Sequence, residues 1–290
     1  CLLVAACAEP APEWFETAPR APTLFAPGVI STEEREYGIT FTPDGREAYF
    51  TRRSRRGPSR IMVTRWEDGR WTGPERAAFA AERDEAPFIT PAGGTLFFAS
   101  RRPIQGTFDR SENIWYVHRG AEGWSDPRPL PGNVNLPRGE VDDFTVGTEL
   151  GPTLTPGGAL LYWTRVSPDW GSDIYVVEPD ENGAFTAPRP LRLNSPGEEL
   201  NPAISPDGQI LVFQGYRRGG LGDDDLYIAR RTDFGWEDPE LLPAPINSVD
   251  SEGHPRFSPD GRLLFFSSDR GGGFDDINVV STEALGGPTQ

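Results

Sequence analysis

Cysteine is almost absent from this chain, which excludes one way of stabilising a fold. The only two cysteines among the 290 residues are Cys1 and Cys7, both at the amino terminus. A disulfide framework in the body of the protein is therefore excluded. Long apolar runs are also missing, because no segment approaches the ~20 consecutive apolar residues that a membrane-spanning helix needs.

Positive charge and common catalytic signatures are scarce as well. The 28 basic residues face 44 acidic ones, which gives a net charge of −16 and an isoelectric point near 4.6. An acidic surface repels phosphate backbones, so we expect no nucleic-acid partner. The sequence contains no G-x-S-x-G, H-E-x-x-H, C-x-x-C or G-x-x-x-x-G-K segment. We therefore predict no catalytic residue from the usual hydrolase, metalloprotease, redox and nucleotide-binding signatures.

The amino terminus has the features of an export signal. The chain opens with CLLVAACAEP, a short apolar stretch followed by small residues. Val4-Ala5-Ala6-Cys7 resembles a bacterial lipobox, which implies that Cys7 carries a lipid and that residues 1–7 are a signal-peptide remnant. Ala8 would be the second residue of the mature protein, and an alanine there implies that the lipid anchors the protein to the outer membrane. We expect a periplasmic lipoprotein whose residues 8–21 form a proline-rich tether and whose lipid is its only contact with the membrane.

What the chain has in excess is glycine, proline and internal repetition. It contains 33 Gly and 30 Pro, which disfavours a helical protein because both residues break helices. Related five-residue strings recur as FTPDG at 41–45, ITPAG at 89–93, LTPGG at 154–158, ISPDG at 204–208 and FSPDG at 257–261. Their prolines are Pro43, Pro91, Pro156, Pro206 and Pro259. Each string joins two β-rich runs, which is the pattern of a hairpin turn.

Each repeat contains four expected strands. A third run rich in Ile, Val and Tyr follows the hairpin, and an aromatic residue followed by Pro marks a fourth strand. The last repeat lacks its fourth strand, but residues 14–31 hold an unassigned copy of it. We therefore predict an all-β, five-bladed β-propeller of four-stranded antiparallel blades over residues 22–285, with residues 286–290 as a tail. Residues 22–30 should complete the last blade beside Ile277–Val280.

The repeats carry a family resemblance. SPDG followed by LLFFSSDRGGGFDDINVV resembles the WD-repeat-like repeat, often called the PD repeat, of TolB-type periplasmic propeller proteins. The resemblance covers roughly residues 20–285 and implies the propeller fold. Related TolB propellers have six blades, so six blades is the structural alternative. The resemblance implies little about function, because propellers host many unrelated activities.

Candidate binding residues lie on the face that carries the loops between strands two and three of each blade, here called the loop-rich face. Seven residues before each repeated proline stands a carboxylate, and we call these five the ring carboxylates: Glu36, Asp84, Glu149, Glu199 and Glu252. We expect them around the mouth of the central channel, where they either cap backbone amides or bind a cation or sugar hydroxyls. An Arg ends strand two in each blade (Arg52, Arg101, Arg165, Arg217, Arg270), and Asp173, Asp225 and Asp276 enter strand three. We interpret these Arg and Asp residues as pairs that stabilise blades.

Two residues break the repeat. His254 lies two residues after Glu252, and no other blade has a His there. Glu252 and His254 could together bind a divalent cation at the channel mouth, or His254 could act as a general acid/base. It could also be an ordinary histidine hydrogen-bonded to Glu252. Trp170, alone in a loop of the same face, is a candidate for stacking on a ligand.

These observations leave two functions open. The first is a non-catalytic binding or scaffold propeller, which we expect to act as a monomer on an envelope protein or glycan. The second is a glycan-acting enzyme, because five-bladed propellers include glycosidases that use carboxylates in a central funnel. A pocket with three inequivalent carboxylates favours the enzyme, and a ring neutralised by Arg favours the scaffold.

Overall fold

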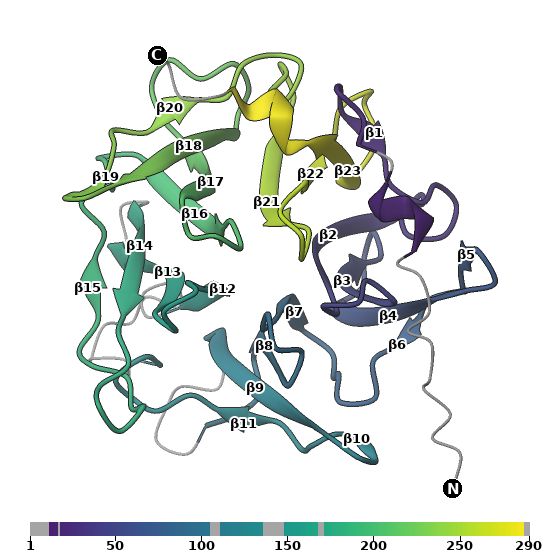
Figure 1. Cartoon of the computed structure of the whole chain (residues 1–290), viewed down its shortest axis with the longest axis horizontal. Helices are drawn as coiled ribbons and strands as arrows, with labels where there is room; N and C mark the ends of the chain where they lie inside the picture. The colour runs from purple at the N-terminus through teal and green to yellow at the C-terminus, as the bar shows by residue number, and fades with distance from the viewer. Residues whose placement is uncertain (1–11, 17, 105–110, 136–147, 168–170, 287–290) are drawn as a thin grey trace, which may run out of the picture.

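The chain folds into a ring of five antiparallel sheets around a central axis (Figure 1). The computed structural model describes residues 12–16, 18–104, 111–135, 148–167 and 171–286. Cys7 and Trp170 therefore lie outside the described residues. Each sheet is one blade, so the prediction of a five-bladed propeller is confirmed and the six-bladed alternative is wrong.

The blades follow one another in chain order, each with its first strand innermost. The first blade contains β2 (Arg35–Phe41), β3 (Glu47–Arg53), β4 (Ser59–Glu67), β5 (Arg70–Trp71) and β6 (Glu75–Arg76). The second contains β7 (Asp84–Ile89), β8 (Thr95–Ser100), β9 (Asn113–Gly120), β10 (Gly123–Trp124) and β11 (Arg128–Pro129). The third contains β12 (Glu149–Leu154), β13 (Leu160–Ser167), β14 (Gly171–Val177) and β15 (Arg189–Pro190).

The last two blades have the same order. The fourth contains β16 (Glu198–Ile204), β17 (Ile210–Tyr216), β18 (Asp225–Thr232), β19 (Gly235–Trp236) and β20 (Glu240–Leu241). The fifth contains β21 (Glu252–Phe257), β22 (Leu263–Ser268), β23 (Asp276–Ser281) and, from the other end of the chain, β1 (Thr23–Leu24). Two short 3₁₀ helices, η1 (Glu13–Phe15) and η2 (Thr282–Leu285), flank the strands.

The amino-terminal strand closes the ring, as predicted. In β1, Thr23 pairs with Val279 and Leu24 with Asn278. The next residue extends the pairing, because the amide of Phe25 donates to the carbonyl of Ile277 at 2.8 Å. The regular strand is shorter than the predicted span of 22–30, but it covers the edge of β23 that would otherwise be open.

Part of the segment 8–21, which we expected to be a tether, packs against the propeller. In η1, Trp14 and Phe15 are buried and join a core cluster with Phe41 and Phe265 of the first and last blades. The indole of Trp14 donates to the carbonyl of Gly45 at 3.2 Å. Prolines before and after this segment suggested a free linker, but the two aromatic rings bury enough apolar surface to hold it against the propeller.

Every innermost strand contains a bulge at the same place. The strand register shifts once in each first-to-second strand pair. Two residues after each ring carboxylate the backbone has a positive φ of 48° to 62°, at Gly38, Ala86, Gly151, Asn201 and His254. A bulge re-aims the side chains on either side of it. These five bulges therefore decide which side chains enter the channel and which enter the blades.

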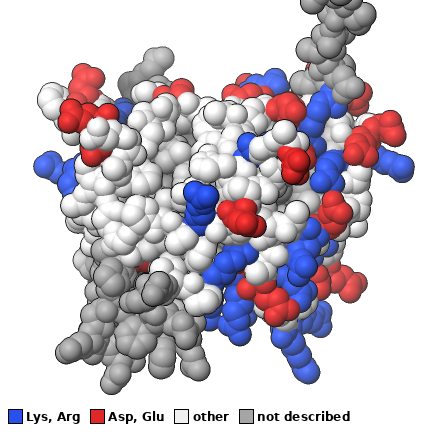
Figure 2. All heavy atoms as spheres, turned by 90° about the horizontal axis from the view of Figure 1, so that it is seen from below, with Lys and Arg blue, Asp and Glu red and all other residues white. Residues whose placement is uncertain are grey.

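The outer surface carries both signs of charge. On the side that Figure 2 draws, basic and acidic side chains are interspersed over the described surface. Exposed pairs such as Arg60–Glu82 at 2.9 Å and Arg65–Glu75 at 2.7 Å neutralise each other locally. In the described part of the chain, no helix has the length and apolar character to cross a membrane.

Candidate functional site

The ring carboxylates are buried inside the blades. All five, including Glu149, have no exposed surface. Three of them follow one pattern, in which the carboxylate accepts hydrogen bonds from the amide and the hydroxyl of a Thr or Ser four residues earlier. For Glu199 these donors belong to Ser195, at 2.9 and 2.6 Å. Thr32 serves Glu36 and Ser248 serves Glu252 in the same way.

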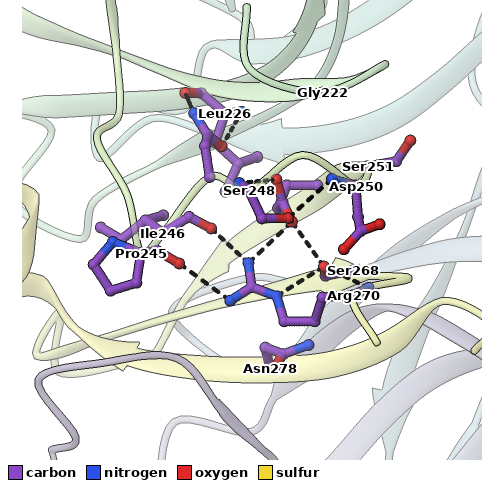
Figure 3. Close-up of polar contacts among 12 residues, drawn as sticks. Gly222, Leu226, Pro245, Ile246, Ser248, Asp250, Ser251, Ser268, Arg270 and Asn278 are labelled. Carbon is purple, nitrogen blue, oxygen red and sulfur yellow. Dashed lines mark hydrogen bonds and ion pairs between the residues drawn. The ribbon is translucent and has the colours of Figure 1, made fainter. Parts of the chain in front are cut away.

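An arginine from the end of the second strand forms a salt bridge with each of these three carboxylates. We call each group of carboxylate, Ser or Thr, and Arg a tie. Arg52, Arg217 and Arg270 contact Glu36, Glu199 and Glu252 at 2.7, 2.8 and 3.0 Å. Figure 3 shows that Arg270 also donates to the carbonyls of Pro245 and Ile246 and to Ser268, so its guanidinium joins the loop between two blades to β22. These contacts match the capping interpretation of the ring carboxylates.

The arginine partners differ from the prediction in two respects. The arginines of these ties pair with the ring carboxylates and not with the Asp residues that enter strand three. Asp225, for example, accepts from the amides of Leu221 and Gly222. In the second blade Arg102 contacts Asp84 at 2.9 Å, whereas Arg101 contacts Glu112. Two adjacent arginines made this choice ambiguous from the sequence.

The ring carboxylates do not line the cavity at the channel mouth. This cavity has a volume of about 400 Å³, and none of the five is among its lining residues. The bulges explain why: the ring carboxylates turn into the blades, and the residues one or two positions later face the channel. Within the described ranges, no group of three or more His, Cys, Asp and Glu side chains is placed to hold a metal ion.

The residues that do line this mouth cavity are strongly polar. They include four arginines and three carboxylates from several blades, together with hydrogen-bonding and aromatic side chains: Arg35, Arg53, Arg101, Arg165, Glu85, Glu112, Asp275, Tyr37, Thr148, Trp163, Asn201 and His254. The carboxylates are inequivalent, since Glu112 contacts Arg101 and Asp275 lies 3.8 Å from Arg35. Small-ligand sites are concave and contain a few converging polar groups, and this cavity is unusual in that polar residues make up most of its lining.

Glu85 is the third carboxylate of the mouth cavity. The hydroxyl of Tyr37 donates to it at 2.6 Å across the boundary between the first two blades. Burial raises the pKa of Glu85, and the nearby charge of Glu112 raises it further, while Tyr37 and the arginines oppose the shift. Burial also raises the pKa of Tyr37, so its phenol stays protonated as a donor.

His254 belongs to a second set of contacts. Its Nδ1 lies 3.2 Å from the hydroxyl of Ser267, and the centroid of its ring lies 4.5 Å from that of the Tyr37 ring. Burial, together with the charge of Arg256, lowers the pKa of His254 to about 3, so the imidazole is neutral near pH 7. Glu252 instead bonds Ser248, Ser268 and Arg270. The structure thus gives the two members of the predicted metal pair different partners, and their joint role as ligands stays a prediction.

A chain of side chains links the bulges of three blades. The indole of Trp163 donates to Asn201 at 3.1 Å, and the amide of Asn201 donates to Gln214 at 2.8 Å. Gln214 in turn accepts from the backbone amide of His254 at 3.3 Å. Gly151 leaves room for this contact, because a Cβ there would lie 2.9 Å from the Asn201 oxygen. Hydrogen bonds between neighbouring blades hold the floor of the cavity in place.

Arg256 makes a further set of contacts between blades. Its guanidinium donates to the carbonyls of Pro202 and Pro255 at 3.0 and 3.1 Å, and to Pro152 at 3.3 Å, so it joins three blades. The other blades have Thr40, Phe88, Thr153 and Ala203 at the equivalent position, four residues after the ring carboxylate. Arg256 is absent from the lining of the mouth cavity but lines a second cavity on the opposite face.

Sequence reasoning missed Glu85, Tyr37, Asn201 and Arg256. The available signal was departure from the repeat: these residues stand at equivalent channel-facing positions where the other blades carry different residue types. His254 shows the same departure from the repeat and does line the cavity. The neighbouring positions are not predictable in the same way, because the bulge that exposes them cannot be read from the repeated strings.

Comparison with solved structures places the fold among propeller proteins. TolB from Acinetobacter baumannii matches with a TM-score of 0.50 and 17% identity over 86% of this chain, which spans 55% of the TolB chain. The chain has a TolB-like propeller fold. The native arabinanase from Bacillus subtilis matches with a TM-score of 0.51 and 11% identity, covering 89% of this chain and 96% of its own.

A third structure has a similar fold. The α-L-arabinofuranosidase from Lactobacillus brevis matches with a TM-score of 0.50 and 14% identity over 87% of this chain and 90% of its own. No protein-family model matches this chain, and no curated protein matches it. At these identities the likeness concerns the fold, since one propeller fold supports many activities.

Proposed function

We propose that the chain is a non-catalytic binding module that holds an acidic envelope glycan in the mouth cavity. The observation that carries this proposal is the composition of the cavity, in which four guanidinium groups face three carboxylates. Arginine is suited to a carboxylate on a ligand because its planar fork can donate two hydrogen bonds. The aromatic ring of Trp163 and the amide of Asn201 add groups that suit sugar hydroxyls and the apolar face of a pyranose.

The charge balance inside the cavity supports an anionic ligand. Four arginines and three acids leave an excess of one positive charge (4 − 3 = 1) in a chain whose net charge is −16. The raised pKa of Glu85 acts in the same direction, because it favours the uncharged carboxyl, whereas His254 is neutral near pH 7 and adds no charge. The size also fits, because small-molecule sites usually have volumes of roughly 300–1,000 Å³.

Arg53 offers the sharpest test. It is exposed at the end of β3 and lines the cavity, whereas Arg56 is exposed in the next turn and does not line it. The full chain would be applied to an array of neutral and uronic-acid oligosaccharides, and each hit would be titrated by calorimetry. Arg53→Gln should weaken binding of an acidic glycan by about tenfold, while Arg56→Gln should leave it unchanged. Equal losses in both variants, or binding of neutral glycans alone, would contradict the proposal.

A glycan-cleaving function is the second candidate. It is favoured by Glu85, a carboxyl group with a raised pKa that shares its cavity with Glu112 and Asp275. A glycosidase needs one carboxyl that keeps its proton and another that is ionised. Two similar folds belong to an arabinanase and an α-L-arabinofuranosidase. Release of reducing sugar from arabinan that Glu85→Gln abolishes would support this function over binding alone.

The location of the module is part of the proposal. The lipobox-like Val4-Ala5-Ala6-Cys7 supports a lipid on Cys7, attachment to the outer membrane and a position in the periplasm. An envelope glycan would then lie within reach of the mouth cavity. An envelope protein remains the alternative partner and would be captured from membrane extracts when no glycan binds.

A further inference from the structure

We propose a second ligand site at the opposite end of the channel, which binds a medium-chain aliphatic carboxylate. This site is the cavity of about 460 Å³ on the face that carries the five repeated Pro-Asp-Gly-type turns, here called the turn-face cavity. It is separate from the proposed glycan site, with which it shares no lining residue.

The walls of the turn-face cavity are largely apolar. All five repeated prolines line it, and between them lie Phe88, Leu154 and Phe257, each only half-buried. An aliphatic chain placed there would remove apolar surface from water on both partners, at roughly 25 cal/mol for each Å². The walls therefore favour a ligand with an apolar body.

The base of this cavity holds Arg256, a cation without an anionic partner among the residues that the structure describes. Arg256 lines the cavity and is 4% exposed. Among the described residues its guanidinium binds three backbone carbonyls, and its Nε has no hydrogen-bond partner. Burial lowers the pKa of Arg256 to about 10, which leaves the side chain charged near pH 7.

One buried edge of the guanidinium has few hydrogen-bond partners and the geometry of a carboxylate receptor. Nη1 is used by two carbonyls, whereas Nη2 has a single contact at 3.3 Å. Nε and Nη2 form one edge of the planar group, and a carboxylate can accept from both of them at once. A buried charge that is not fully compensated is costly, so an anionic head beside Arg256 would relieve that cost.

The acidic groups at the rim are already engaged in their turns. Asp44 accepts from the hydroxyl of Thr42 at 2.6 Å, and Asp260 pairs with Arg262 at 2.7 Å. They therefore do not provide the missing partner of Arg256. The site combines apolar walls, one buried cation and rim carboxylates that are already hydrogen-bonded, and this combination fits a fatty-acid-like anion better than a sugar or a cation.

The first experiment compares two ligands that differ only in charge. The full chain is titrated by calorimetry with octanoate and with octanamide. We expect saturable binding of octanoate that is at least about tenfold tighter than that of octanamide, because hydrogen bonds to charged groups are the stronger ones. Equal affinities, or no binding of octanoate, would overturn the proposal.

Variants then locate the site. Arg256→Gln should abolish the preference for octanoate over octanamide. Because Arg256 joins three blades, a matched pair at the wall provides a test that does not depend on that variant folding. Leu154→Glu should weaken octanoate binding at least about tenfold relative to Leu154→Gln, since only the first adds a repelling charge. Arg53→Gln, at the other end of the channel, should leave octanoate binding unchanged, and a loss there would place the ligand in the mouth cavity instead.

Discussion

The tie between Glu199 and Arg217 should contribute several kilocalories per mole to the free energy of unfolding. Glu199 is fully buried, and Arg217 is 15% exposed and also donates to the carbonyl of Leu193 at 2.8 Å. Glu199→Gln would keep the shape of the side chain but leave the guanidinium without its anion. Removing one partner of a buried pair costs about 3–5 kcal/mol, a large part of the ~5–15 kcal/mol that stabilises an ordinary domain.

A double-mutant cycle measures the coupling energy between Glu199 and Arg217 separately from the destabilisation that each substitution causes alone. Glu199→Gln, Arg217→Met and the double variant would be unfolded in urea, with the slope of each transition checked for constancy. The matched control is the exposed pair Glu178–Arg189, whose side chains are 54% and 64% accessible and 3.1 Å apart. We expect a coupling energy of about 2 kcal/mol or more for the buried pair and about 0–1 kcal/mol for the exposed one. Equal coupling in the two cycles would refute the structural role that we assign to the ring carboxylates.

The other predictions concern the amino terminus and His254. Mass spectrometry of the protein from bacterial membranes should show acyl chains on Cys7, and an unmodified thiol in that preparation would contradict the lipobox assignment. Deleting residues up to 30 removes β1, so the edge of β23 should cause aggregation or a broader unfolding transition; unchanged unfolding would show that the ring closes without it. Because the folded-state pKa of His254 is lowered to about 3, its stabilising contribution is present above the unfolded pKa of about 6.5 and is lost as pH falls towards 3. Between about pH 7 and 5 the wild type should therefore lose up to about 2 kcal/mol more than His254→Asn, a variant that copies the left-handed Asn201 of the neighbouring blade; equal losses would contradict the assignment.

The fold could be predicted from the sequence because the same turn and strand pattern occurs five times. Five related turns at nearly regular spacing each specify a hairpin, and the unassigned strand at the amino terminus balances the strand missing at the other end. A single weak signal would not have been sufficient, but errors in one repeat are corrected by the other four. The short helix η1 could not be predicted from the repeats, because Trp14 and Phe15 pack in a context that occurs only once.

The direction of the side chains could not be predicted in the same way. Alternation along a regular strand assigns every second residue to one face, and a bulge reverses that assignment beyond it. Ala86 carries a positive φ of 51°, which nothing in its residue type suggests, because alanine rarely adopts this conformation. The sequence therefore located the innermost strands but pointed to Asp84, when its neighbour Glu85 is the residue that lines the mouth cavity.

Comparison of the repeats also distinguishes residues that stabilise the ring from residues that can recognise a ligand. A contact that recurs in several blades, such as a buried carboxylate with its Ser or Thr and its Arg, solves a problem that every blade has in common. A residue at a channel-facing position has no such constraint, since five equivalent positions converge on one space and only their sum must fit. The position four residues after the ring carboxylate shows this directly, with Thr40, Phe88, Thr153 and Ala203 in four blades and Arg256 in the fifth. One long cation can occupy the axis only because the other four blades place shorter or uncharged side chains there, and that asymmetry gives each end of the channel its own chemistry.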